Sequence, residues 1–209
     1  LAFYGSDMRG WVKNIVPANS ILPPFDRYGP RGREFGLRGT LKYDPTDAFS
    51  ARLKVAYGKV SGAATNANAQ MVNCPYGTTQ LVGVVSDCKA DNRIARTDNI
   101  GTLFTPYEPK FRDGQTWVTQ DQILASLELN YKLSDTIDLT SVTGFYRSTF
   151  KDSDVYGAYP VVPLLQFGVA FGLPDVAVYA ELRNREISQE LRVNSNFDGP
   201  LNFTVGGIY

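Results

Sequence analysis

The sequence predicts an all-β protein whose antiparallel strands belong to a transmembrane β-barrel. Three observations lead to this fold class. Apolar and polar residues alternate along several segments, tight turns and long loops follow one another in a regular order, and the alternating segments are about as long as a bilayer crossing requires.

The alternation is clearest in residues 123–133, ILASLELNYKL, where apolar residues fall on one parity and mostly polar residues on the other. Successive side chains of a strand point to opposite faces, so such a segment has one apolar and one mostly polar face. The same pattern recurs, with less regularity in 137–150 and only weakly in 1–16. The expected strands, about seven in all, are 1–16, 34–43, 48–59, 123–133, 137–150, 184–195 and 200–209.

The connections are of two kinds, and they alternate along the chain. Tight turns are expected at DPTD (44–47), SDT (134–136) and NFDGP (196–200), which are rich in turn-favouring residues. Long loops are expected at about 17–32, 61–118 and 156–182. Adjacent antiparallel strands place alternate connections at opposite ends. All short turns should therefore lie at one end of the sheet and all long loops at the other, which is typical of transmembrane barrels.

The strand ends carry aromatic residues, and strands of about 10 to 14 residues match the ~9–11 residues that cross a bilayer at a tilt. Aromatic residues near strand ends suit the interfacial girdles of membrane proteins. They are Trp11, Tyr43, Tyr57, Tyr131 and Tyr146. The same alternation also fits a soluble sandwich, and it is the order of turns and loops that favours the barrel.

Composition excludes several function classes. The chain has 21 basic and 21 acidic residues and no histidine among 209 residues. Zero net charge gives no electrostatic footprint for nucleic acid. The absence of histidine removes Ser-His-Asp and Cys-His catalysis and histidine metal sites. Because the chain starts at Leu1 without a methionine and stops within an alternating pattern at Tyr209, we expect an internal piece of a longer protein.

Three phrases of the sequence resemble the barrel of TonB-dependent outer-membrane receptors, most closely the set found in sphingomonad-type bacteria. They are a strand that ends in a Tyr-x-Pro-Thr-Asp turn (43–47), an SVTGY-like strand (141–146), and a stretch similar to SQELRL…DGPLxWxxGxFY (188–209). Phe203 stands where the family often has Trp. The resemblance covers nearly all the expected strands and none of the long loops.

The resemblance implies an outer-membrane receptor of a Gram-negative bacterium with a barrel of about 22 strands, of which residues 1–209 supply about seven. Such receptors import a scarce nutrient, for example a ferric siderophore or an oligosaccharide, with energy from TonB and its inner-membrane complex. The plug domain and the TonB box are not visible in this chain. The alternatives are a passive outer-membrane channel or another barrel protein, and a secreted carbohydrate-binding β-sandwich.

We expect no enzyme, no cofactor and no metal site. Carboxylate pairs such as Asp152/Asp154 and Glu186/Glu190 are interpreted as lining a wet face. A small-molecule substrate would lie among the long loops, where aromatic rings stack on sugars and catechols. The candidate contacts are Tyr107, Phe111, Trp117, Tyr156, Tyr159 and Phe167. Packing between loops is the competing explanation for each of them.

The two cysteines, Cys74 and Cys88, lie in the 61–118 loop, in a region without alternation. An oxidising compartment such as the cell surface favours a disulfide between nearby cysteines. We therefore predict a Cys74–Cys88 disulfide, with two free buried thiols as the alternative.

Overall fold

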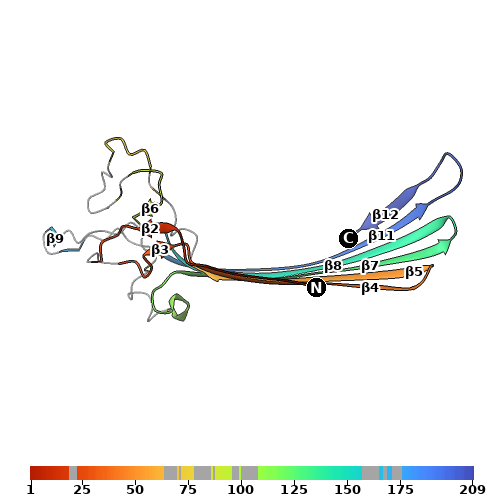
Figure 1. Ribbon diagram of the computed structural model, residues 1–209, viewed down its shortest axis with the longest axis horizontal. Helices are drawn as coiled ribbons and strands as arrows, with labels where there is room; N and C mark the ends of the chain where they lie inside the picture. Colours follow the sequence, from red (N-terminus) through yellow and green to blue (C-terminus); the bar gives the residue numbers. More distant parts are fainter. Residues whose placement is uncertain are drawn as a thin grey trace.

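The protein is all-β in the computed structural model, which describes residues 1–18, 23–63, 70, 72–77, 86, 88–95, 99, 108–156, 165–166, 169–170 and 176–209. Its main feature is one long, curved sheet of seven strands in the order β1-β4-β5-β7-β8-β11-β12, in which every neighbouring pair is antiparallel (Figure 1). The strands are β1 (Ala2–Met8), β4 (Gly32–Thr46), β5 (Phe49–Gly62), β7 (Trp117–Ser134), β8 (Ile137–Tyr156), β11 (Val176–Ser195) and β12 (Thr204–Ile208). The predicted antiparallel all-β fold is confirmed.

Several strands are longer than the 10 to 14 residues expected. β8 and β11 each have 20 residues and β7 has 18. The expected loop at 156–182 was therefore too long, because β11 begins at Val176. In their loop-side halves these strands carry polar residues on both faces, such as Thr149 and Asp152 of β8. Alternation could not mark such stretches as strand.

The first expected strand, 1–16, is in fact two strands in different sheets. β1 ends at Met8, and β2 (Val12–Asn14) joins a small sheet with β3 (Tyr28–Gly29) and β6 (Arg93–Ile94). The chain turns away at Gly10, whose φ is +90°. A Cβ there would lie 2.6 Å from the Gly29 backbone, so both the conformation and the close approach require glycine.

The three short connections lie at one end of the sheet and the long ones at the other, as expected (Figure 1). Asp47–Ala48 and Asp135–Thr136 are two-residue turns, and residues 196–203 form a longer one. The first turn is shorter than the predicted DPTD. β4 continues through Pro45, and its pairing with β5 shifts register between Tyr43 and Thr46, because proline has no N–H to donate to the ladder.

The register keeps residues of equal parity together across the whole sheet. Apart from the irregularities next to the first two turns, odd residues pair with odd and even with even. The sheet therefore has an odd face and an even face. The apolar stretches of the odd face, which we call the apolar belt, are 35–43 on β4, 49–57 on β5, 123–133 on β7, 137–145 on β8 and 187–193 on β11.

Among the described side chains, no hydrophobic residue of the seven-stranded sheet is buried. The buried hydrophobic residues all lie at the loop end: Val12, Val16, Cys88, Ile94, Ala95 and Phe111. In contrast, the apolar belt is exposed, with 66% of Leu41, 58% of Ile187 and 49% of Leu191 accessible. Two small sheets, β3-β2-β6 and β9 (Leu165–Gln166) with β10 (Val169–Ala170), lie beyond the loop end of the large sheet and leave this face uncovered (Figure 1).

The large sheet is open, with β1 and β12 at its two edges. The only helix among the described residues is the 3-10 helix η2 (Pro109–Phe111). None of the described helical segments has the length and hydrophobicity of a membrane span.

Cys74 and Cys88 are joined by a disulfide in the 61–118 connection, which is the pairing the sequence predicts. The Asn73 N–H donates to the Cys88 carbonyl oxygen at 3.1 Å, and the Gly77 N–H donates to the Cys74 carbonyl oxygen at 2.9 Å. Cys88 is buried. The bridge therefore belongs to the packed part of the loop end, away from the large sheet.

The disulfide predicts that the unfolded chain, without reductant, has no titratable thiol. Replacing both cysteines with serine should increase protease cleavage between residues 74 and 88. In the loop-closure model, removing a bond that closes a loop of ~15 residues lowers the free energy of unfolding by about 3 kcal/mol, because the unfolded chain is no longer constrained. Circular dichroism of the sheet should not change, since the bridge lies outside it. Two reactive thiols per chain in the wild-type protein would show that the bond is absent.

Candidate functional site at the loop end and along the even face

The even face carries a polar network near the turn end of the sheet. Arg52 of β5 forms an ion pair with Glu128, its register partner on β7. Asn130 donates to the Glu128 carboxylate at 3.1 Å and accepts a hydrogen bond from the Thr140 hydroxyl at 2.9 Å. The network crosses three strands and leaves its charges compensated, so it makes a hydrophilic surface rather than a reactive centre.

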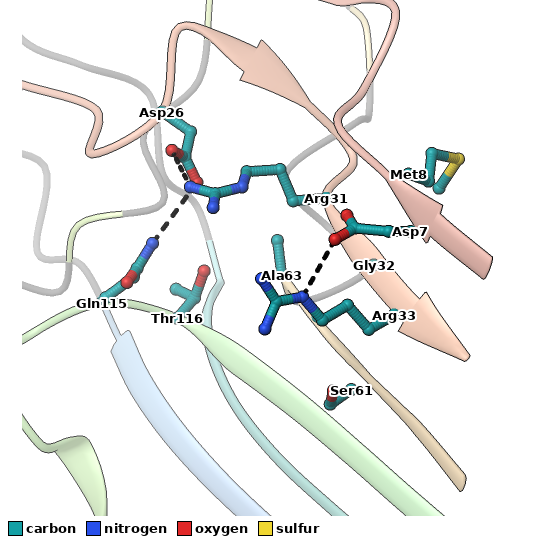
Figure 2. A pocket seen from close by; sticks show the side chains of 11 residues that line it. Asp7, Met8, Asp26, Arg31, Gly32, Arg33, Ser61, Ala63, Gln115 and Thr116 are labelled. Atoms are coloured by element: carbon teal, nitrogen blue, oxygen red, sulfur yellow. Dashed lines mark hydrogen bonds and ion pairs between the residues drawn. The ribbon is translucent and has the colours of Figure 1, made fainter. Parts of the chain in front are cut away.

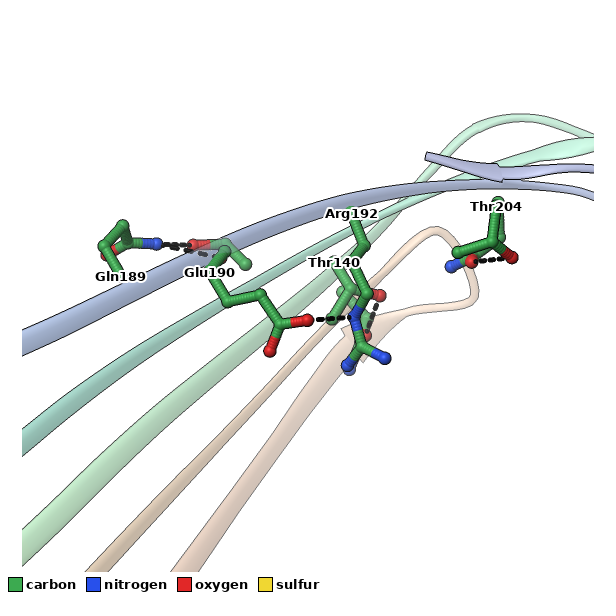
Figure 3. Close-up of polar contacts among 8 residues, drawn as sticks. Thr140, Gln189, Glu190, Arg192 and Thr204 are labelled. Atoms are coloured by element: carbon green, nitrogen blue, oxygen red, sulfur yellow. Dashed lines mark hydrogen bonds and ion pairs between the residues drawn. The ribbon is translucent and has the colours of Figure 1, made fainter. Parts of the chain in front are cut away.

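A second set of polar contacts lies on β11 and β12. Glu190 and Arg192 project from the same side of β11 and lie 2.9 Å apart, and the Thr204 hydroxyl donates to Asn194 at 2.9 Å (Figure 3). Large apolar residues on this face include two pairs of register partners, Leu124 with Tyr146 and Phe150 with Leu182. The even face is thus mostly polar from β4 to β12.

A polar pocket of about 200 Å³ lies where the loop end begins (Figure 2). Asp26 is held from two sides, by Arg31 at 2.6 Å and by the Gln115 side-chain amide at 3.5 Å. On the opposite wall Arg33 pairs with Asp7 at 3.2 Å. Ligand pockets usually measure about 300–1,000 Å³, so this pocket is too small to enclose a whole ligand of that kind.

Aromatic rings and cations form a second cluster at the loop end. The Trp117 and Tyr179 rings are 6.1 Å apart, and their planes are tilted by 51°. The Arg112 guanidinium lies 3.9 Å from the Trp117 ring centre, and the Lys110 ammonium lies 4.4 Å from the Tyr179 ring centre. Such cation–π contacts hold the rings in place. The Trp117 indole N–H also donates to the Lys110 carbonyl oxygen at 2.9 Å.

Glu181 connects this cluster to β8 and β11. Its carboxylate lies 2.5 Å from Arg183 and 3.6 Å from Lys151, and accepts a hydrogen bond from the Tyr179 hydroxyl at 3.0 Å. The hydrogen bonds from Arg183 and then Tyr179 lower the pKa of Glu181. On the even face, burial and the neighbouring Asp154 raise the pKa of Asp152.

Three of the six predicted ligand contacts, Phe111, Trp117 and Tyr156, are among the residues that the structure describes. Phe111 is buried and packs against Ala177 and Tyr179, so its ring has a structural role here. Trp117 is partly exposed and stacks with Arg112. Tyr156 ends β8. Tyr107, Tyr159 and Phe167 lie outside the described residues. Ligand contact by any of the six stays a prediction.

Sequence reasoning missed the partners that organise the loop end. Tyr179 fell inside the expected 156–182 loop, and Lys110 and Arg112 lay in a segment without pattern. Asp26 and Gln115 are 89 residues apart in sequence. One signal was present: Lys110 and Arg112 flank Phe111 and precede Trp117 by seven and five residues, which is a local cation–aromatic pattern.

No protein-family model, curated protein sequence or solved structure matches this chain. The site must therefore be interpreted from its own chemistry. Among the described residues, no group of three or more Asp, Glu, Cys or His side chains could hold a metal ion. The arrangement offers two separate polar surfaces: the even face of the sheet, and a loop end where a small pocket and an aromatic cluster are built largely from odd-numbered residues of the same strands. Both surfaces suit contact with polar solutes.

The Glu181 interactions predict a pH-dependent loop end. A carboxyl with a lowered pKa stabilises the folded form fully above its ordinary pKa of 4.5, and this stabilisation is lost as the pH falls through the lowered value. NMR of ¹³C-labelled tyrosine should show the Tyr179 ring shift changing below about pH 4.5. The change should vanish in Glu181→Gln, while an unchanged titration in that variant would contradict the assignment. Tyr179→Phe identifies the signal.

Proposed function

We propose that this chain is part of the transmembrane β-barrel of an outer-membrane receptor that imports a scarce nutrient with energy supplied through TonB. The observation that carries the proposal is the exposed apolar belt of the odd face, opposite a mostly polar even face. Soluble monomers rarely expose apolar patches larger than a few hundred Å². Lipid would cover such a belt without a second protein layer.

The dimensions of the apolar belt support a lipid-facing surface. On β4, β5 and β8 it covers nine residues each: 35–43, 49–57 and 137–145. At about 3.3 Å per residue this is about 30 Å along the strand. A strand tilted by about 40° then crosses about 23 Å, close to the ~25 Å apolar band of outer-membrane barrels.

The apolar belt is also slanted relative to the strands, as tilted strands in a flat membrane require. The row of register partners that begins at Phe35 on β4 reaches Thr149 on β8, four residues beyond the end of the belt at Phe145. The row from Tyr43 reaches Ser141, again four residues from the belt's other end at Ile137. Over three strand spacings of ~4.8 Å, this displacement corresponds to a tilt of about 40°, within the 35–45° of membrane barrels.

The few polar side chains inside the belt form hydrogen bonds with one another, as polar groups surrounded by lipid must. The Thr143 hydroxyl donates to the Gln189 side-chain oxygen at 2.6 Å, and the Gln189 amide donates to the Ser141 hydroxyl at 2.9 Å. On the proposed lumen side, the even face supplies the polar network.

The resemblance to TonB-dependent receptors is the support for energy coupling. In this proposal TonB and its inner-membrane complex act through parts outside this chain, and the partners of this chain are outer-membrane lipid and a small-molecule substrate. The aromatic cluster around Trp117 would contribute to substrate capture at the cell surface. A secreted sandwich would need a second large sheet over one face, and the described small sheets do not provide one.

The proposal predicts which residues meet lipid. A lipid-restricted photoprobe should label cysteine variants at Leu53, Leu127 and Leu191, and should spare variants at the adjacent Arg52, Glu128 and Arg192. Leu127→Arg should destabilise the membrane-inserted protein by about 2–4 kcal/mol, whereas Ser126→Arg on the even face serves as the control. Equal protection of both parities from solvent and lipid would favour a sandwich core.

A conductance measurement separates a receptor from a passive channel. The full-length protein in a planar bilayer should give no steady ion current if a plug fills the barrel, and it should bind the purified periplasmic domain of TonB. A steady current without TonB binding would identify a channel. A lipid-facing belt with neither property would leave the barrel in place but remove the receptor.

A further inference from the structure

Two arginines on the odd face lie directly above the apolar belt. Arg147 of β8 and Arg185 of β11 are register partners, and both side chains are exposed. The next pair toward the belt is Phe145 and Ile187. The Arg185 guanidinium lies 6.0 Å from the Phe145 ring centre. The two charges therefore mark the boundary between apolar and polar surface on these strands.

Among the described residues, neither guanidinium forms an ion pair. Two acids of this face, Glu181 and Asp121, lie near the doublet in the register. Glu181 is paired with Arg183 and Lys151. Asp121 stands between Lys59 of β5 and Thr149 of β8, diagonal to Arg147, and forms no ion pair with either arginine of the doublet. Arg33 farther along is paired with Asp7. Arg147 and Arg185 are thus a doublet of positive charge without a matching carboxylate.

Like charges directly opposite one another on neighbouring strands are destabilising. Their side chains start about 4.5–5.5 Å apart at Cβ, so both guanidinium groups can reach one anion. Arginine presents donors in a planar fork that matches phosphate oxygens and forms bidentate hydrogen bonds. A phosphate between the two side chains would replace repulsion by two charge-assisted contacts.

We propose that Arg147 and Arg185 bind the phosphate of a glycolipid in the outer leaflet of the outer membrane. This inference rests on the proposed function, since it requires the odd face to meet lipid. The doublet lies at the edge of the apolar belt on the loop side, which is the depth of the headgroups. Ile187, 58% exposed directly below it, offers the surface that an acyl chain covers and that a soluble anion would leave exposed.

The test uses the full-length protein in dodecylmaltoside micelles and diphosphoryl lipid A as the probe, with binding followed by native mass spectrometry. Arg147→Gln/Arg185→Gln should lower affinity at least tenfold. Arg147→Lys/Arg185→Lys, which keeps charge but loses the fork, should give an intermediate loss. The matched control Arg33→Gln/Lys59→Gln removes two cations of the same face that have acidic neighbours, and it should change affinity less than twofold.

Three further measurements distinguish a glycolipid from a soluble anion and separate this inference from the proposed function. Inorganic phosphate should not compete with the glycolipid at equal concentration; equal competition would replace the lipid by a soluble anion and overturn the proposal. Equal binding by the Gln double variant and the wild type would also overturn it. The melting temperature of the Gln double variant in lipid-free micelles should not fall, because the substitution removes repulsion. If the photoprobe labels Leu127 but the Gln double variant binds the glycolipid as the wild type does, this inference alone is refuted. If the photoprobe does not label Leu127, the proposed function is refuted.

Discussion

The structure depends on one constraint: the odd face of a single-layer sheet exposes an apolar belt that nothing in the described part of the chain covers. Hydrophobic burial, the main favourable term in folding, is almost absent from this sheet when the chain is considered in water. The proposed lipid surroundings would resolve this difficulty. They would also account for three other features. Leu41 and Leu191 are exposed, Ser141, Thr143 and Gln189 form hydrogen bonds with one another, and the opposite face is hydrophilic.

The sequence allowed the sheet to be predicted well where one face is apolar and the other polar. Residues 123–133 and 184–195 both lie in strands of the large sheet, and the order of turns and loops was correct. Prediction failed where that contrast disappears. The loop-side halves of β7 and β8 carry polar residues on both faces, and the first residues of β11, Val176–Ala180, are apolar on both faces. The departure of the chain at Gly10 depends on contact with Gly29, which is distant in sequence.

The candidate site was less predictable because long-range contacts assemble it. Trp117 was identified from its residue type, but its partners Tyr179 and Arg112 come from a strand and a loop that no local pattern joins. The ion pair between Arg52 and Glu128 needs the register of two strands 76 residues apart. Only the disulfide could be predicted outright, since the chain has two cysteines and hence a single pairing.

The consistent parity of the register has a consequence for how such a chain can change during evolution. A single inserted or deleted residue within a strand would exchange the two faces beyond that point, and would bring arginines and glutamates onto the side of the apolar belt. Changes of length in the strands should therefore survive in pairs, or next to the turn at Asp47–Ala48, where the pairing already shifts. The long connections carry no such restriction, so their length and sequence can change while the sheet stays the same.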